Sequence, residues 1–455
     1  MATKRQELNM TEGPFLKKII LFLIPLVLTG LLQTLYNAAD LVVVGRFRGE
    51  LALAAVGCTG SLTNLIVGLF MGLSVGAGVL VAHAIGANEQ ERVQKVVHNS
   101  VLLAAILGIV VAIGGFIFAP QLLRLMDTPE TVLAGATLYL RIILCGVPAS
   151  MLYNYCAAMV RSTGDTKHPL IFLTISGVVN VVLNVILVAL FGMGVEGVAI
   201  ATIASQYLSA GMILVFMMRS DTCIRFSPRK LGFDGKIVKK ILYIGVPSGI
   251  QGCLFSFSNV LIQSSINSFG DIVMAGNAAG ANIEGFVYIA MNAVYHASLT
   301  FVGQNMGAKN YKNIKRITLL CAICAAVIGL STAGIFLVFR RFFVGLYVSG
   351  SAAVAEAAYL RMFYIMTPYF LCGIMEVLCG TMRGMGKSIS AMVISLLGAC
   401  VFRILWLETV FVMFPAIECV YLSYPISWAL TIVAYVICLT VAYRHLTRPN
   451  NELSV

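Results

Sequence analysis

Long apolar runs, separated by short polar segments, form the dominant pattern of the sequence. A helix needs about 20 apolar residues to cross roughly 30 Å of hydrocarbon, and twelve runs meet that length. They cover residues 18–45, 53–82, 94–120, 131–158, 168–190, 195–218, 237–269, 274–303, 315–340, 353–381, 388–413 and 419–445. The pattern predicts an all-α polytopic membrane protein with twelve transmembrane helices.

The longest polar interruption, at 219–236, divides the predicted helices into two sets of six. We expect a cytoplasmic N-terminal segment (1–17), an N-lobe (18–218), a cytoplasmic linker (219–236), a C-lobe (237–445) and a cytoplasmic tail (446–455). Most of the 31 Lys and Arg residues then fall on one side of the membrane. Because basic loops stay inside, both termini are predicted to be cytoplasmic.

The two sets of helices resemble each other at a shift of about 222 residues. Tyr139-Leu140-Arg141 matches Tyr359-Leu360-Arg361, and Pro148 matches Pro368. This indicates an internal duplication into two six-helix lobes. Such an architecture is common in secondary transporters, which bind substrate between repeats. The alternative is that the duplication records only how the fold arose.

Composition excludes a soluble globule. The chain is 59% hydrophobic and 11% charged, whereas a soluble domain is about 45–50% apolar and about 25% charged. The net charge of +12 does not indicate a nucleic-acid partner, because the basic residues lie in short clusters between apolar runs. The expected partners are the lipid bilayer and small amphipathic molecules.

Polar side chains form a stripe on the first predicted helix. Gln33, Asn37 and Asp40 are spaced i, i+4 and i+7, which places them on one helical face. An ionisable group in hydrocarbon costs at least about 2.5–3.5 kcal/mol, so it usually faces the protein interior and has a task. We therefore interpret Asp40 as functional.

Three further oxygen-bearing side chains fall at the depth of Asp40. Asn180 and Asn184 lie on the fifth predicted helix and Thr202 on the sixth. Na⁺ prefers oxygen ligands, as other hard cations do, and a carboxylate removed from water can carry a proton. The four residues form a candidate site for coupling to H⁺ or Na⁺. The alternative for the neutral three is hydrogen bonding across helices.

Charged residues also lie within the apolar runs of the C-terminal half. They include Glu284, Glu376, Arg403 and Glu408. We expect ion pairing, with a second coupling site at Glu284 and Glu376 as the alternative. Arg141 and Arg361 lie near outer helix ends, where we expect them to snorkel to the interface.

The sequence shows no convergent catalytic set. The segment 380–388 resembles a phosphate-binding loop, but Thr381 occupies the position of its first glycine and no strand precedes it. The five histidines include no pair at i, i+4 spacing. We therefore expect no enzyme activity, no cofactor, and no metal except possible Na⁺ at Asp40.

Several segments together resemble the multidrug and toxic compound extrusion (MATE) transporters of the prokaryotic branch. They are the first-span segment Gln33-Thr-Leu-Tyr36-Asn-Ala-Ala-Asp40 through Arg46, Phe301-Val-Gly303-Gln304-Asn305-Met-Gly307-Ala308, and the paired loops at 161–167 and 383–386. The resemblance covers essentially the whole chain. It implies a multi-pass protein of the prokaryotic plasma (inner) membrane that functions as a monomer. It further implies export of organic cations and amphipathic compounds by antiport with H⁺ or Na⁺.

The resemblance also implies residue roles. Prokaryotic members use an Asp on the first span, an Asn and an Asp on the fifth, and a Thr on the sixth. Asp40, Asn180 and Thr202 match, whereas Asn184 stands where the second Asp is expected. Asp40 is then the only acid of this site, and the coupling ion stays open between H⁺ and Na⁺.

A substrate surface follows from the same resemblance. It would comprise Gln33, Tyr36, Met151, Asn154 and Asn180, with core packing as the alternative for Met151. Tyr stacks on flat cations and Met adapts its shape, which suits loose specificity.

Two prolines occupy equivalent places in the first helix of each lobe, Pro25 and Pro247. A proline inside a helix removes a backbone hydrogen bond and permits bending. We expect bending of the first helix to couple Asp40 to cavity volume.

The main competing function is a flippase for lipid-linked or other amphipathic lipids, which shares the two-lobe fold. A flippase would be expected to line its cavity with Arg or Lys for phosphate. The sequence places only Arg403 near mid-membrane, which disfavours this alternative. A membrane-embedded enzyme and a receptor are less favoured still.

Overall fold

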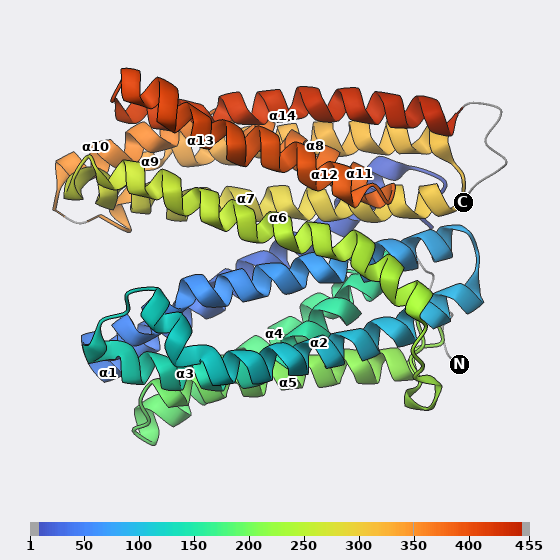
Figure 1. Ribbon diagram of the computed structural model, residues 1–455, viewed down its shortest axis with the longest axis horizontal. Coiled ribbons are helices and arrows are strands. Elements are labelled where there is room, and N and C mark those ends of the chain that lie inside the picture. The colour runs from blue at the N-terminus through green and yellow to red at the C-terminus, as the bar shows by residue number, and fades with distance from the viewer. Residues whose placement is uncertain (1–8, 349, 448–455) are drawn as a thin grey trace. The chain divides into compact units, whose positions relative to one another are not determined.

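The computed structural model describes residues 9–348 and 350–447, and all regular elements in this part of the chain are helical (Figure 1). The α-helices are α1 (Phe15–Gly86), α2 (Gln90–Leu125), α3 (Glu130–Ser162), α4 (Lys167–Asn184), α5 (Val195–Arg219), α6 (Gly235–Asn267), α7 (Asp271–Gly307), α8 (Tyr311–Val338), α9 (Arg340–Gly345), α10 (Ala352–Arg361), α11 (Tyr369–Gly384), α12 (Ser388–Ser395), α13 (Phe402–Trp406) and α14 (Ile417–Leu446). Four π-helical segments, η1 (Val185–Leu190), η3 (Met362–Met366), η4 (Leu396–Val401) and η5 (Leu407–Phe411), and one 3₁₀ turn, η2 (Pro228–Lys230), complete the set.

The described helices supply the predicted number of membrane spans. Eleven are long and apolar enough to cross a bilayer, and a bent pair makes a twelfth. Helix α1 contains two of them, Phe15–Phe47 and Ala54–Gly86, which meet at Gly49. Gly49 has φ of 77°, a left-handed conformation that only glycine adopts without strain. The predicted all-α fold with twelve spans is confirmed.

The tenth span differs from its prediction. Residues 353–381 were expected to form one helix, but Ala352–Met366 and Tyr369–Gly384 are bent by 45° at the break between them. Pro368 lies in this break, where it has no N–H to continue the ladder and its ring clashes with the preceding turn. Its counterpart Pro148 stays inside the continuous helix α3.

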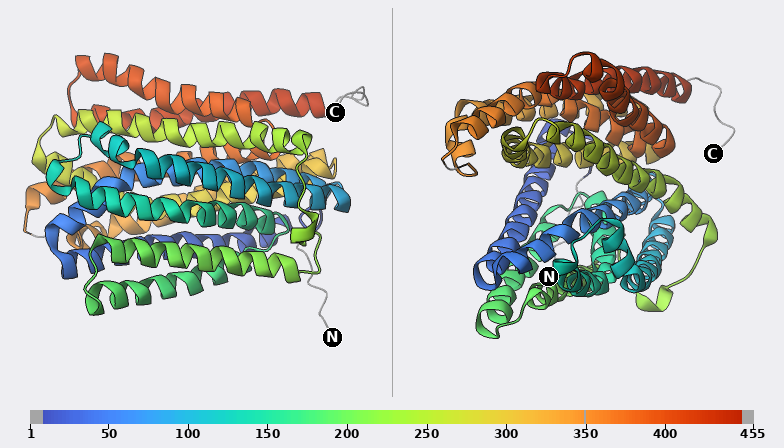
Figure 2. Two further views of the ribbon diagram at one scale, coloured as in Figure 1. Left: turned by 60° about the horizontal axis from the view of Figure 1, so that its bottom comes forward. Right: turned by 60° about the vertical axis from the view of Figure 1, so that its left-hand side comes forward.

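The chain forms two compact units. The first unit contains Ile24–Gly249, and the second contains Met10–Leu23 together with the chain from Ile250 onward. The passage between units therefore occurs inside helices α1 and α6, whereas the whole segment 219–236 belongs to the first unit. The lobe boundaries expected at that segment stay a prediction. Figure 2 shows the long helices of each unit running alongside one another.

In the first unit, α3 packs against α2 and α5, and α4 packs against α5. Glycines bring the second half of α1 against α6. A Cβ added to Gly76 would lie 2.1 Å from the carbonyl oxygen of Ile241, and one added to Gly72 would lie 2.3 Å from the amide nitrogen of Gly249. Such small residues let transmembrane helices approach closely.

In the second unit, α7 packs against α8, α10 and α11, and α11 also packs against α14. The start of the described chain is fastened to this unit. Asn305 donates its amide to the carbonyl of Met10 at 2.8 Å, and Asn313 donates to that of Thr11 at 2.9 Å. The ring of Phe22 then meets Phe301 edge-on at 5.7 Å.

Candidate ion-coupling site

Helices α1, α4 and α5 bring the four candidate coupling residues together. Asn184 donates its amide to Asp40 Oδ1 at 2.5 Å and also reaches Asn180 Oδ1 at 3.3 Å. Thr202 donates its hydroxyl to Asp40 Oδ2 at 3.4 Å, and Asn180 Nδ2 lies 3.5 Å from Thr202 Oγ1. The shared depth expected from the sequence therefore corresponds to direct contact.

The electrostatics of this cluster favour a cation. Among the described residues, no Lys, Arg or His lies within ion-pair distance of Asp40. Asn184 is fully buried at 0% exposure, and no donor of the described chain reaches its Oδ1. A buried acceptor beside an unpaired carboxylate suits a proton or a hard cation, because each adds the positive charge that both groups lack.

Local helix geometry places these side chains. Asn180 and Asn184 are one turn apart on α4, so they share a face. Helix α4 ends at Asn184, where the π-helical segment η1 begins. Such segments are often found at functional sites. On α5, the hydroxyl of Thr202 is also anchored to the carbonyl of Val198 at 2.9 Å.

The predicted substrate residues have different environments. Tyr36 packs its ring on Gly177 and donates its hydroxyl to the carbonyl of Thr174 at 3.3 Å, so it joins α1 to α4. Gln33 is exposed, and Asn154 is half-buried. Met151 is fully buried at 0% exposure, which favours the packing alternative. A substrate-binding role for this set stays a prediction.

Arg361 differs from its expected position. It was predicted to snorkel toward the interface, but its side chain is buried and forms an ion pair with Glu284 at 2.6 Å. It also donates to Asn277 Oδ1 at 2.5 Å. Its repeat counterpart Arg141 instead donates to the carbonyl of Phe116 and stays partly exposed. The snorkelling prediction for Arg361 is wrong because depth along a span does not reveal which way a side chain points.

The remaining charges of the C-terminal half do not pair with one another. Glu408 is exposed and Glu376 is half-buried, and neither lies within ion-pair distance of a described basic group. Arg403 is buried against the Tyr424 ring. The expected pairing therefore holds for Glu284 alone, with Arg361 as its partner.

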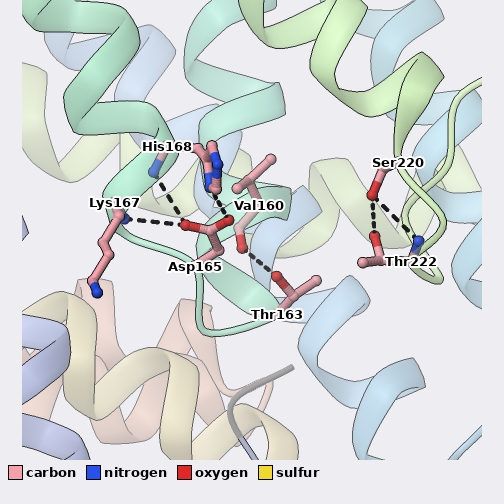
Figure 3. A network of polar contacts seen from close by, with 7 residues as sticks. All are labelled: Val160, Thr163, Asp165, Lys167, His168, Ser220 and Thr222. Atoms are coloured by element: carbon pink, nitrogen blue, oxygen red, sulfur yellow. Dashed lines mark hydrogen bonds and ion pairs between the residues drawn. The ribbon is translucent and has the colours of Figure 1, made fainter. Parts of the chain in front are cut away.

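One polar cluster, at the opposite end of α4 from Asn184, was not anticipated (Figure 3). Asp165, in the turn before α4, accepts hydrogen bonds from the backbone amides of Lys167 and His168, both at 3.1 Å, and from the His168 ring. That ring stacks on Phe216 of α5 at 4.4 Å. Burial raises the pKa of Asp165, but these bonds and the nearby His168 charge together lower it below the usual value. The cluster fastens the start of α4 to α5.

A sequence signal for this cluster existed. Asp165 stands two residues before the first helical residue, Lys167, where aspartate commonly accepts hydrogen bonds from the opening amides of a helix. The stacking of His168 on Phe216 had no comparable signal, because the two residues lie on different helices.

Comparison with known proteins agrees with this architecture. The MatE family model matches residues 25–186 and 247–406. The probable multidrug resistance protein YoeA of Bacillus subtilis is 29% identical over 387 residues, covering 84% of this chain and 83% of the relative. The probable multidrug resistance protein NorM of Thermotoga maritima is 26% identical over 391 residues, covering 83% and 82% of the two chains.

Solved structures show the same fold. A MOP superfamily transporter from Pyrococcus furiosus superposes with a TM-score of 0.91 at 21% identity, covering 98% of this chain and 100% of that one. The family model matches once in each half, which confirms the predicted duplication, and its two matches together cover more than half of the sequence. The chain belongs to the MatE family of membrane transporters.

Proposed function

We propose that this protein is a secondary active exporter of organic cations and other amphipathic compounds. It exchanges them for H⁺ or Na⁺ through alternating access of its two lobes. Membership in a family of multidrug efflux transporters supports the transport of small molecules. The observation that carries the coupling step is Asp40, a carboxylate that accepts hydrogen bonds from Asn184 and Thr202 and has no ion-pair partner within residues 9–348 and 350–447.

Coupling follows from the charge at this cluster. When Asp40 is ionised, its negative charge lies in a low-dielectric environment without a described basic partner, which is energetically unfavourable. Binding of H⁺ or Na⁺ removes that charge. The oxygens that would hold Na⁺ are those of Asp40, Asn184 and Thr202, whereas a proton would need Asp40 alone.

Substrate and ion are linked through one helix. Gln33 and Tyr36 precede Asp40 on α1, and Tyr36 also contacts α4, which carries the two asparagines of the cluster. A change in charge at Asp40 therefore alters the same helix pair that would contact a substrate. We assign the substrate surface to Gln33, Tyr36, Asn154 and Asn180, with Met151 packed behind it.

The proposal places the protein in the plasma membrane of a prokaryote, with both termini cytoplasmic and the monomer as the functional form. Support for the orientation comes from the concentration of basic residues in the segments assigned to the cytoplasm.

Transport in liposomes tests the coupling step. Purified protein is reconstituted, a pH or Na⁺ gradient is imposed separately, and ethidium movement is followed by fluorescence. We expect gradient-driven transport in the wild type and its loss in Asp40→Asn, because the amide cannot take up a proton or supply a full charge to Na⁺. The gradient that drives ethidium transport identifies the coupling ion.

The matched control is Asp127→Asn, an exposed aspartate outside the cluster, which should transport at the wild-type rate. Transport that survives Asp40→Asn would move the coupling site elsewhere, with Glu284 and Glu376 next to be tested.

A lipid flippase remains the second candidate because Arg361 joins Arg403 as a buried arginine of the second unit. Guanidinium groups suit phosphate. Absence of ethidium transport in folded protein, together with flipping of a fluorescent phospholipid, would favour this function.

A further inference from the structure

Arg403 is a buried arginine without an acidic partner. It lies on α13 and is 6% exposed. Its Nε donates to Ser427 Oγ at 2.8 Å, but among the described residues no carboxylate comes within 4.0 Å of its guanidinium. A charge removed from water in this way is strongly unfavourable unless something compensates it.

Aromatic rings provide only part of that compensation. The guanidinium carbon lies 4.2 Å from the centroid of the Tyr424 ring and 5.8 Å from that of Trp428. A cation–π contact stabilises a desolvated cation only modestly. The cost of burying one ion is larger, so the rings stabilise Arg403 without neutralising it.

The neighbouring arginine, Arg361, has its own acidic partner and does not compensate the charge of Arg403. Arg361 lies 6.0 Å from the same Tyr424 ring, so two guanidinium groups share one aromatic side chain. The Arg361 charge is offset by Glu284 at 2.6 Å, which leaves that of Arg403 unmatched. The Nε of Arg361 is also buried and has no acceptor among the residues that the structure describes.

Both arginines lie at irregular turns of their helices. The π-helical segment η3 begins directly after Arg361, and Arg403 stands between η4 and η5. Such turns are rare in proteins and often occur at functional sites. This geometry favours a binding role over simple packing.

We propose that the second unit binds an anionic group, the carboxylate or phosphate of an amphipathic molecule, at Arg403. The guanidinium offers a planar pair of donors for such an oxyanion. Arg361 adds no net charge, because Glu284 pairs with it, and Tyr424 and Trp428 supply apolar contact for the rest of the molecule. The transported compounds would then include zwitterionic and anionic amphiphiles, an extension that rests on the proposed function, whereas binding itself can be measured without transport.

The two tryptophans of the chain, Trp406 and Trp428, allow a direct test. Trp406→Phe leaves Trp428 as the only indole, beside Arg403. The full-length protein in detergent is titrated with octyl phosphate and, in parallel, with octyltrimethylammonium, and Trp428 emission is recorded. We expect a saturable change with octyl phosphate and no saturable change with the ammonium compound.

Arg403→Gln in this background should weaken octyl phosphate binding at least about tenfold, because it removes the charge from the hydrogen bonds to the oxyanion. Arg403→Lys should retain part of the affinity. Arg141→Gln, a change of the partly exposed repeat counterpart of Arg361, is the matched control and should bind as the parent does.

Unchanged octyl phosphate binding by folded Arg403→Gln would overturn the proposal. If that variant does not fold, Arg403→Lys decides, since affinity equal to the parent would exclude a role for the guanidinium. An equal response of the parent to both amphiphiles would also exclude the anion site.

Repeating the titration in nanodiscs distinguishes a lipid headgroup from a free amphiphile as the source of the anion. Weaker octyl phosphate binding in phosphatidylglycerol than in phosphatidylcholine would identify a lipid headgroup as the occupant. Equal binding in both lipids would identify a free amphiphile. Octyl phosphate binding in protein that does not transport ethidium would contradict the proposed function alone.

Discussion

Asn184 shows how a single amide sets the character of the proposed coupling site. Its Nδ2 donates to Asp40 and Asn180, and its buried Oδ1 has no donor in the part of the chain that the structure describes. The site therefore contains one acid and several neutral oxygens. Coulomb attraction for Na⁺ scales with that charge, so we expect this residue to limit how strongly Na⁺ competes with H⁺ at the proposed site.

Asn184→Asp should strengthen Na⁺ binding. Two carboxylates in contact cannot both ionise without a counter-ion, so either one is protonated or Na⁺ binds between them. We expect at least about a tenfold lower half-saturating Na⁺ concentration for thermal stabilisation in detergent, with choline chloride as the reference salt.

Asn154→Asp, which adds an acid outside the cluster, serves as the control and should respond to Na⁺ as the wild type does. A wild-type Na⁺ response in Asn184→Asp would show that the cluster does not bind this ion.

Residue patterns predicted which polar side chains meet at Asp40, but not the partners of the other buried charges. Helical spacing and depth were enough to group Asp40, Asn180, Asn184 and Thr202, because span order and direction fix how far each side chain lies from the surface. The same reasoning misplaced Arg361. Depth is encoded by position along the chain, whereas the partner of a buried charge depends on how helices rotate against each other.

At the scale of the helices, the duplication is also visible in two spans that each end in a π-helical segment. Segment η1 begins at Val185, and η5 begins at Leu407, the position that the shift of about 222 residues pairs with it. Neither π-turn could be predicted, because one extra residue in a turn does not change the hydropathy pattern of the sequence. The bend at the tenth span was equally hidden, since Pro148 and Pro368 share a repeat position but only Pro368 lies at a break.

Close helix contact gives a prediction for α1 and α6. Gly76→Ala places a methyl group 2.1 Å from the Ile241 carbonyl oxygen, and backbone atoms there cannot move aside cheaply. We expect a loss of about 1–3 kcal/mol, as for other overpacked interiors, seen as a lower unfolding temperature in detergent.

Gly68→Ala on the same helix is the matched control, because its Cβ would meet nothing within 4 Å. It should leave stability unchanged or raise it slightly through helix propensity. Equal unfolding temperatures for the two variants would contradict the close approach of α1 and α6.

At the scale of the whole molecule, two helices carry the chain from one unit to the other. The unit changes between Leu23 and Ile24 in α1 and between Gly249 and Ile250 in α6. Pro25 and Pro247 each lie within a few residues of these points, inside their helices. Both helices therefore lack a backbone hydrogen bond close to where they leave one compact unit for the next.

Because Pro25 and Pro247 lie beside the points where the chain passes between units, we expect bending at these prolines to accompany alternating access. Pro25→Ala and Pro247→Ala restore the missing hydrogen bond and should stiffen α1 and α6. We expect each variant to slow gradient-driven ethidium transport several-fold in liposomes while equilibrium ethidium binding in detergent stays unchanged, since neither proline belongs to the assigned substrate surface. Pro120→Ala, which alters a proline inside α2 away from both passages, controls for the general effect of removing a helical proline. A normal transport rate in both Pro25→Ala and Pro247→Ala would exclude the bending mechanism, even if Asp40 proves essential for coupling.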